Sequence, residues 1–418
     1  MGNQPRVIFV NRVYWPEASA TAQLLTDLAE GLASRGWKVQ VVTSGAVSEP
    51  RDEVVIHRTG PTEALGNLSS RLRGYWAFIR KARKKLTQLI QPGDVVVVMT
   101  DPPLLGAALA RLARRRGALV VHWVQDVYPE IASVHLSAAA AFLLAPLRLR
   151  RNGNAAWRSA RSCVVLGDTM ARLVASHNVP TERIVTVPNW APRELHGIPS
   201  EAVIAAQRER WNLTGRFVVA YSGDLGRVNE FSALLGAAEI LRTHPEIVFL
   251  FIGSGPRLAE VRAAVDATQL PNVRFLPAVP RENLAVALAA ADVQCVTLHP
   301  DFASLVYPSK LAGILAAGRP VLFVGPTGGE IARLIAARSC GATADPQGAK
   351  QIAALLESWR DDRSQRSFLG RNARATYEKL FTLDSALVRW EEVLHRATRA
   401  DRVPLTWLDD SNQSTSTL

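Results

Sequence analysis

Short apolar runs alternate with longer amphipathic stretches along nearly the whole chain. In the first half, the runs that predict strands are Val7–Val10, Val39–Thr43, Val95–Met99, Leu119–Val124, Cys163–Leu166 and Ile184–Val187. In the second half, they are Phe217–Tyr221, Val248–Ile252, Val273–Leu276, Val293–Leu298 and Pro320–Val324. Strands buried on both faces have nearly continuous apolar sequences, and parallel sheets alternate with helices. The pattern therefore predicts an α/β protein with two doubly wound, Rossmann-like sheets.

Both periodicities are interrupted between residues 188 and 199, where prolines and a glycine cluster. Such a segment is typical of a boundary between domains. We expect one Rossmann-like domain over residues 1–195 and another over 196–382. A helix over 383–400 and a polar tail over 401–418 follow them. Ligands of such sheets bind at the carboxyl ends of the strands, so a cleft between the two domains is expected there.

Composition narrows the class of protein, and the charge distribution divides the chain. The 418 residues are 48% hydrophobic and 21% charged, which excludes disordered and fibrous proteins. The net charge is +12, and residues 1–200 hold 25 Lys and Arg against 14 Asp and Glu, a surplus of 11. The remaining residues hold 24 against 23. The first half is therefore expected to meet an anionic partner.

Two segments of the basic half have the composition of interfacial helices. Residues 69–90 combine an apolar stripe that includes Leu72 and Trp76 with a strongly basic remainder, and residues 131–151 are uncharged and then abruptly basic. The alternative is a solvated charged face over an ordinary core stripe. No secretory signal is visible, three widely spaced cysteines suit a reducing compartment, and no stretch is long enough to span a bilayer. We expect a cytoplasmic protein, peripherally attached to an anionic membrane surface through residues 69–90 and 131–151.

Three segments place small residues where a phosphate can approach a helix or a turn. Ser19 and Thr21 open a helix after the first strand, although an ordinary capped helix start has the same appearance. Two glycine turns follow successive strands of the second sheet, and ordinary turns are the alternative. The turns contain Gly223, Gly226, Arg227, Gly253 and Gly255.

The third segment is the sequence VYPSKLAGILAAGRP at residues 306–320. Pro308 and Ser309 begin a small-residue helix with Lys310 in its first turn. A cation there opposes the helix dipole unless an anion is bound. This conflict favours assigning Lys310 to a diphosphate, and the alternative is a solvated lysine.

These motifs together resemble a GT-B glycosyltransferase of family 4. The sequences that carry the resemblance are YWPEASATAQLL, VQDVYPE, YSGDLGR, FIGSGP, PSKLAGILAAGRP and GGEIARLI, and it extends from Arg6 to about Val393. It is closest to the bacterial branch that builds exopolysaccharide, capsule, colanic-acid-type and O-antigen units. The resemblance implies two domains facing each other across a cleft, with C-terminal helices packing back toward the N-terminal domain. It also implies retaining sugar transfer from a nucleoside-diphosphate donor, for which we expect UDP, to a lipid-linked or glycan acceptor.

The resemblance assigns roles to residues of the second domain. Lys310 and Arg227 would neutralise the donor diphosphate during catalysis, the backbone at Phe275 would hold the base, and Leu311 would lie at the donor. Gly328, Gly329 and Glu330 would lie near the donor sugar or ribose. No Asp-x-Asp occurs, so neither a metal nor any other cofactor is expected.

The candidate for acceptor chemistry is Asp126, at the end of a buried strand where the family often has histidine. A partly desolvated carboxylate there can take or position the proton of an acceptor hydroxyl, and a turn-capping aspartate is the alternative. Asp101 and Asn189 also follow strands on the acceptor side. His122, within the strand, is expected to be a hydrogen-bonded core residue.

Two departures from the wider family limit the residues that can be assigned by resemblance. The family usually has two glutamates eight residues apart, and the matching positions here are Leu305 and Gly313. The usual Arg and Lys after the first strand of the second domain fall on Gly223 and Asn229. Ribose and phosphate contacts must therefore come from other groups.

Two other functions compete with sugar transfer. A nucleotide-sugar epimerase of the same fold needs an acid/base pair around the sugar and no acceptor surface, so the basic first half argues against it. A nucleic-acid-binding protein would show a recognised module or aromatic residues interleaved with the positive charge, and neither is present. No nucleic-acid partner is therefore expected.

Overall fold

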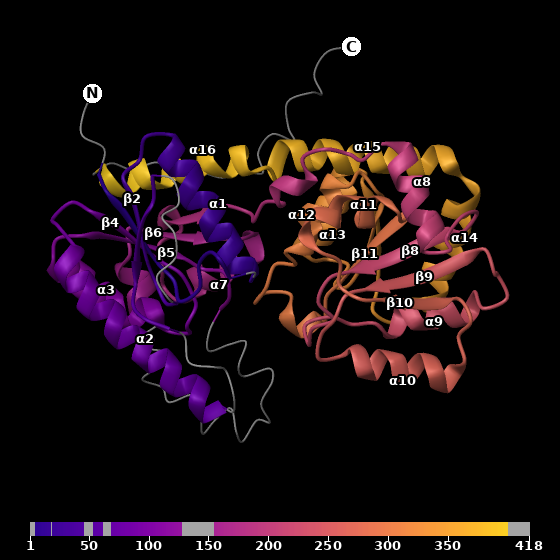
Figure 1. Cartoon of the computed structure of the whole chain (residues 1–418), viewed down its shortest axis with the longest axis horizontal. Helices are drawn as coiled ribbons and strands as arrows, with labels where there is room; N and C mark the ends of the chain where they lie inside the picture. The colour runs from indigo at the N-terminus through magenta and orange to yellow at the C-terminus, as the bar shows by residue number, and fades with distance from the viewer. Residues whose placement is uncertain (1–4, 18, 46–52, 62–67, 128–153, 400–418) are drawn as a thin grey trace, which may run out of the picture. The chain divides into compact units, whose positions relative to one another are not determined.

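The computed structural model describes residues 5–17, 19–45, 53–61, 68–127 and 154–399. The chain divides into two compact units (Figure 1). One comprises Met1–Pro188, Ser304–Val306 and Leu383–Leu418, and the other comprises Asn189–Ala303 and Tyr307–Thr382. The second unit thus begins at Asn189 rather than at residue 196. The predicted segment 131–151 and the tail 401–418 lie outside the described residues.

The first unit contains a parallel sheet in the order β3-β2-β1-β4-β5-β6-β7. Its strands are β1 (Val7–Val10), β2 (Val39–Thr43), β3 (Val55–Arg58), β4 (Val95–Val98), β5 (Leu119–Trp123), β6 (Ser162–Val165) and β7 (Ile184–Thr186). Its helices are α1 (Ala20–Ser34), α2 (Leu68–Leu89), α3 (Leu105–Arg115), α7 (Asp168–Ser176) and α16 (Leu383–Thr398), with a 3-10 turn at Thr181–Arg183.

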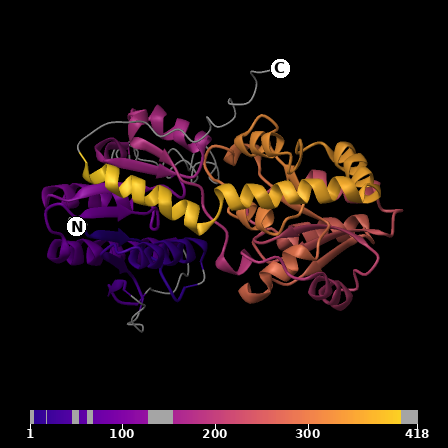
Figure 2. The same ribbon diagram turned by 90° about the horizontal axis from the view of Figure 1, so that it is seen from above.

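Alternate residues of the central strands face different helices of this unit. Ile8 and Val10 of β1 pack in one cluster with residues of α2 and α3, which lie together in Figure 1. On the same strand, Phe9 meets Trp390 of α16 in an edge-to-face contact with ring centroids 6.3 Å apart. Since successive side chains of a strand point to opposite faces, helices cover the sheet on both sides. Figure 2 shows α16, in yellow, lying along this unit.

The second unit contains a parallel sheet in the order β10-β9-β8-β11-β12-β13. Its strands are β8 (Phe217–Ser222), β9 (Ile247–Ile252), β10 (Val273–Leu276), β11 (Val293–Thr297), β12 (Val321–Val324) and β13 (Gly341–Ala344). Its α-helices are α8 (Glu201–Arg210), α9 (Ser232–Ile240), α10 (Leu258–Thr268), α11 (Leu284–Ala289), α12 (Lys310–Ala316), α13 (Glu330–Arg338), α14 (Ala349–Asp361) and α15 (Arg363–Leu380). Its 3-10 turns are Arg193–Leu195, Arg281–Asn283 and Pro300–Phe302.

The two doubly wound sheets confirm the predicted fold class, with two strands that the apolar pattern missed. Val55–Arg58 and Gly341–Ala344 each pair with a single neighbour at a sheet edge. Edge strands are less fully buried, so their sequences need not be continuous apolar runs. Gly341 has a further constraint, since a Cβ atom there would lie 1.9 Å from the carbonyl oxygen of Val321.

The apolar stripe of α2 differs from the prediction in its first half. Leu72 is 48% exposed and Trp76 is 67% exposed, whereas Ile79 and Leu86 are buried with Phe78 and other residues nearer the end of the helix. Among the described side chains of α2, the buried ones lie in its later turns. Among the described residues, no helix combines the length and apolar character that crossing a bilayer requires.

Candidate functional site

The side chain of Lys310, at the start of α12, is held by an aromatic ring and two oxygen atoms. Its ammonium group lies 3.7 Å from the centroid of the Tyr221 ring and donates hydrogen bonds to Tyr221 Oη and, at 3.4 Å, to the carbonyl oxygen of Asp224. Burial lowers the pKa of Lys310 to about 7, and the charge of Asp224 opposes this shift. The partners of this lysine are thus neutral oxygens and a ring, and an arriving anion would meet a cation that has no carboxylate bonded to it.

The two predicted glycine turns lie against each other at the carboxyl ends of β8 and β9. The Gly223 N–H donates to the carbonyl oxygen of Ile252 at 2.9 Å, and Leu225 N–H donates to that of Ser254 at 2.8 Å. Gly253 has φ +145°, and a Cβ atom there would lie 2.0 Å from the Gly223 carbonyl oxygen. Glycine is required because backbone meets backbone at this point. A Cβ atom on Gly223 would lie 3.6 Å from Lys310 Nζ, so the first turn and the lysine share one site.

Tyr221 is a member of this site that the sequence did not reveal. It is the fifth residue of β8, and its hydroxyl donates to the carbonyl oxygen of Asp224 at 2.7 Å while accepting from Lys310. Burial raises the pKa of Tyr221, so the phenol stays neutral and keeps its proton. The apolar run of β8 concealed this role, because a tyrosine within a strand is ordinarily a core residue.

Other residues assigned to donor binding are distributed around the same end of the sheet. Gly255, with φ +146°, lies against the backbone of Leu225, and Gly226 is buried. Phe275 on β10 stacks on Phe251 at 5.4 Å, and the Arg262 guanidinium lies 4.5 Å from the Phe275 ring centroid. Arg227 is exposed, and no hydrogen bond or ion pair in the described part of the chain involves it. The structure therefore places Arg227 at the turn without fixing its guanidinium.

The remaining donor-side residues lie at the starts of helices α12 and α13. Pro308 and Ser309 immediately precede α12, and Leu311, its second residue, is fully buried. Gly329 precedes α13, Glu330 is its first residue, and Gly328 is exposed. No Cβ clash would arise at Gly328, where nothing lies within 4 Å.

In the first unit, the predicted carboxylate Asp126 lies just beyond the end of β5. Burial raises its pKa to about 6, and the negative charge of Asp101 contributes in the same direction. Asp101 itself accepts two hydrogen bonds from the guanidinium of Arg12, at 3.0 and 2.9 Å. Asp101 therefore binds Arg12, and Asp126 is the carboxylate with a pKa suited to accepting a proton near neutral pH.

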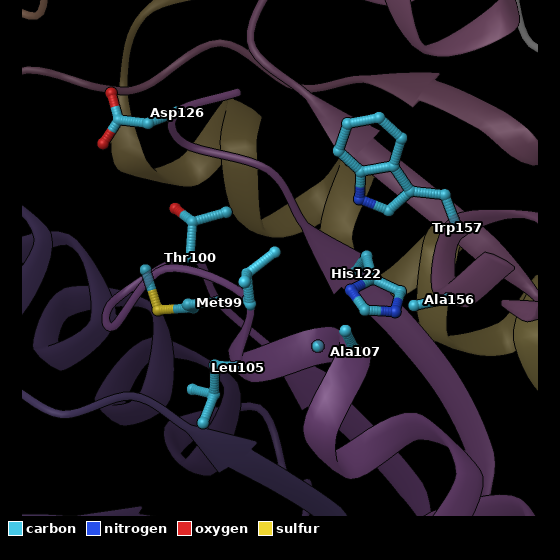
Figure 3. Close-up of a pocket in the computed structure, with 10 residues that line it drawn as sticks. Met99, Thr100, Leu105, Ala107, His122, Asp126, Ala156 and Trp157 are labelled. Carbon is cyan, nitrogen blue, oxygen red and sulfur yellow. The ribbon is translucent and has the colours of Figure 1, made fainter. Parts of the chain in front are cut away.

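His122 lies in the same pocket as Asp126 but points elsewhere. In Figure 3, its imidazole lies near Ala107 and Trp157, whereas the Asp126 carboxylate lies beyond Thr100 and turns away from it. His122 is buried in the core as expected, but its Nε2 has no hydrogen-bond partner among the described residues. Burial lowers its pKa to about 4. A Cβ atom on Gly106 would lie 2.1 Å from the ring, which explains the glycine in α3.

Ser19, Thr21 and Asn189 complete the predicted set. The Ser19 hydroxyl accepts from the N–H of Ala22 at 3.3 Å and caps α1, and Thr21 lies in the first turn of that helix. Asn189 is buried and is the first residue of the second unit. The structure thus groups Lys310 with the glycine turns in one unit and Asp126 with Asp101 in the other.

The fold and these strand-end sites define an α/β protein of the GT-B class. Residues 21–194 match the domain Glycosyltransferase Family 4, and residues 203–376 match Glycosyl transferases group 1. The chain belongs to the glycosyltransferases of family 4 and is an enzyme of that kind.

Curated relatives agree with this assignment, and a solved structure agrees with the fold. The chain is 30% identical to the glycosyltransferase WbjE of Pseudomonas aeruginosa over 277 residues, covering 65% of this chain and 68% of that protein. It is 24% identical to the colanic acid biosynthesis glycosyl transferase WcaI of Escherichia coli, covering 73% of this chain and 79% of that protein. HepE of Anabaena, solved in complex with UDP-glucose, has a TM-score of 0.69 at 16% identity and covers 93% of this chain and 99% of its own.

Proposed function

We propose that the protein transfers a sugar, with retention of configuration, from a UDP-sugar to a lipid-linked or glycan acceptor in cell-surface polysaccharide biosynthesis. The observation that carries the proposal is Lys310, whose ammonium lies beside Gly223 at the strand end where the two glycine turns meet. The UDP-glucose complex of HepE supports the donor class, and the name of WcaI supports the polysaccharide context.

The residues of the second unit supply the charge that a departing diphosphate needs. When the bond between the sugar and the diphosphate breaks, negative charge grows on the β-phosphate of the leaving group, and a positioned cation stabilises it. Lys310 would exchange its hydrogen bonds to Tyr221 and Asp224 for the phosphate, and Tyr221 would remain as a neutral donor. Arg227, being exposed, would join after the donor is bound. We propose that these groups act without a metal ion or another cofactor.

Asp126 is proposed to act on the acceptor. With a pKa of about 6, it is ionised at neutral pH and basic enough to receive or orient a hydroxyl proton. Asp101, held by Arg12, raises that pKa and remains in place as a charged neighbour.

The donor assignment is tested with a panel of UDP- and GDP-sugars, using calorimetric titration and slow donor hydrolysis as readouts. We expect a UDP-sugar to bind and Lys310→Ala to weaken binding about 10- to 100-fold, as the loss of a charged hydrogen bond predicts. The exposed Lys350→Ala in the same unit is the matched control and should change nothing. Equal binding by both variants would contradict the site. Epimerised donor in the absence of any acceptor would instead favour the epimerase.

We further propose that the first unit attaches to the inner face of the cytoplasmic membrane through α2. Leu72 and Trp76 are exposed on this helix, and exposed basic side chains accompany them. The basic group comprises Arg73, Arg80, Lys81, Arg83 and Lys84. A large aromatic ring beside cationic side chains suits the interface of an anionic leaflet, where each basic residue contributes about 1 kcal/mol.

Flotation with vesicles tests this attachment. The protein should float with vesicles rich in phosphatidylglycerol at low salt and remain unbound at high salt or with phosphatidylcholine alone. Trp76→Ala should reduce flotation several-fold. Phe368→Ala removes a half-exposed aromatic side chain from α15 and serves as the control that should not. A wild-type protein that never floats would refute the attachment.

A further inference from the structure

A second polar cavity lies in the second unit, at the amino ends of β11 and β12. Its volume is about 390 Å³, within the range of small-molecule sites. The charged residues that line it are Glu201, Arg208, Asp292, Arg319, Arg363 and Arg366. Lys310 and the glycine turns lie instead toward the carboxyl ends of the strands, so this cavity is separate from the proposed donor site.

The cavity carries a surplus of positive charge that the protein does not neutralise. Arg208 pairs with Asp292 at 3.1 Å, which leaves three arginines facing the single carboxylate of Glu201. Arg363 forms no hydrogen bond or ion pair within the described residues, and it lies at the exposed start of α15. Arg319 Nε is buried and lacks a hydrogen-bond partner among those residues. The exposed Arg363 therefore offers the cavity guanidinium donors that no described residue uses.

The backbone holds these guanidinium groups in place. Arg208 donates to the carbonyl oxygen of Ala290 at 2.9 Å, Arg366 donates to that of Arg360 at 2.8 Å, and Arg319 donates to that of Ala289 at 2.5 Å. Burial lowers the pKa of Arg319; the charges of Asp292 and Glu201 oppose this shift, and those of Arg208 and Arg366 add to it. Like charges fixed this close repel one another, and an anion bound between them would relieve the repulsion.

We propose that this cavity is a second anion site, which binds a small ligand bearing phosphate groups. Guanidinium groups match phosphate oxygens in geometry, and the Ser367 hydroxyl on the wall offers one more donor. The ligand is a free polyphosphate or a phosphate ester, and the chemistry common to both is a multiply charged phosphate. The site does not depend on the proposed donor chemistry, because none of its residues belongs to that site.

Calorimetric titration of the Lys310→Ala protein tests the second site without interference from the first. Inorganic diphosphate and a hexose 6-phosphate are the two probes, and they distinguish a free phosphate from an ester. We expect one of them to bind with one site per chain and Arg363→Gln to weaken binding at least 10-fold. Arg371→Gln is the matched control, since Arg371 is exposed on the same helix outside the cavity.

Arg363→Gln removes no described contact, so the variant is expected to fold. Arg319→Gln is a second variant and should reduce the same binding, with circular dichroism checking its fold. If neither probe binds, or if both variants bind as tightly as the control, the arginines serve only to cap backbone carbonyls and the proposal is overturned. Failure of UDP-sugar binding in the wild-type protein would leave this result unaffected.

Discussion

At the residue scale, the raised pKa of Asp126 makes the proposed reaction depend on pH. Below pH 6 this group is protonated and cannot accept a proton, so kcat/KM should fall as the pH drops through about 6. Asp126→Asn should lower kcat/KM about 100-fold or more, as the loss of a general base predicts, and should remove the acidic limb. A pH-rate profile of both proteins at fixed ionic strength provides the measurement.

The pH-rate profile of an Asp101 variant is the matched comparison for that of Asp126→Asn. Asp101→Asn removes a negative charge that raises the Asp126 pKa, and it also releases the positive charge of Arg12. Both changes favour the ionised carboxylate, so the acidic limb should move to lower pH while the enzyme remains active. An acidic limb that survives in Asp126→Asn would show that another group is responsible.

At the residue scale, the sequence revealed some side chains and concealed others for physical reasons. Lys310 was visible because a cation at a helix start conflicts with the dipole, and the structure places it at the first position of α12. Tyr221 was concealed because it lies within an apolar strand and its contact with Lys310 joins residues distant in sequence. His122 also looked ordinary, since neither its missing partner nor its fit against Gly106 can be read from neighbouring residues.

At the scale of elements, the two glycine turns form one backbone contact between β8 and β9. Gly253→Ala would place a Cβ atom 2.0 Å from the Gly223 carbonyl oxygen, at φ +145°. We expect it to reduce the free energy of unfolding by at least about 1–3 kcal/mol and to weaken UDP-sugar binding, because it displaces the turn beside Lys310. Denaturant unfolding and calorimetric titration measure the two effects.

Gly328→Ala is the control for the Gly253→Ala substitution. Its position has no atom within 4 Å of a new Cβ atom and no positive φ, so stability should be unchanged. If Gly253→Ala behaved like Gly328→Ala, the close approach of the two turns would be refuted.

The fully buried strands were all predicted, and the two strands that the apolar pattern missed are only partly buried. Every residue of β1 and β4 is buried, and both strands were predicted from their apolar runs. β3 and β13 are half-buried edge strands, and β13 consists of Gly, Ala and Thr. For α2 the pattern erred in the other direction: Leu72 and Trp76 belong to its apolar stripe, but both side chains are exposed. Hydrophobic patterns thus report which residues are apolar but not which of them the fold covers.

At the scale of the whole molecule, the chain returns to its first unit after completing the second. α16 packs on α1, β4 and β5, and Arg35 of α1 pairs with Glu391 of α16 at 3.0 Å. The helical period of residues 383–400 predicted a helix, but an apolar stripe alone does not identify the sheet that it covers. That pairing depends on contacts more than 300 positions apart in the sequence, such as the hydrogen bond from Trp37 Nε1 to Glu391 at 3.2 Å.

The last helix should therefore stabilise the first unit rather than the unit that precedes it in sequence. Trp390 is fully buried and contacts Trp123 of β5 edge to face, with ring centroids 4.9 Å apart. Trp390→Ala should cost the first unit about 3–5 kcal/mol, as the loss of a large core side chain predicts. Hydrogen exchange with mass spectrometry should show β4 and β5 losing protection while β8 and β9 retain theirs, with UDP-sugar binding in the second unit preserved. Trp390→Phe keeps an aromatic ring, removes an indole N–H that has no partner in the described residues, and should remain near wild type. Equal loss of protection in both sheets would show that α16 is not specific to the first.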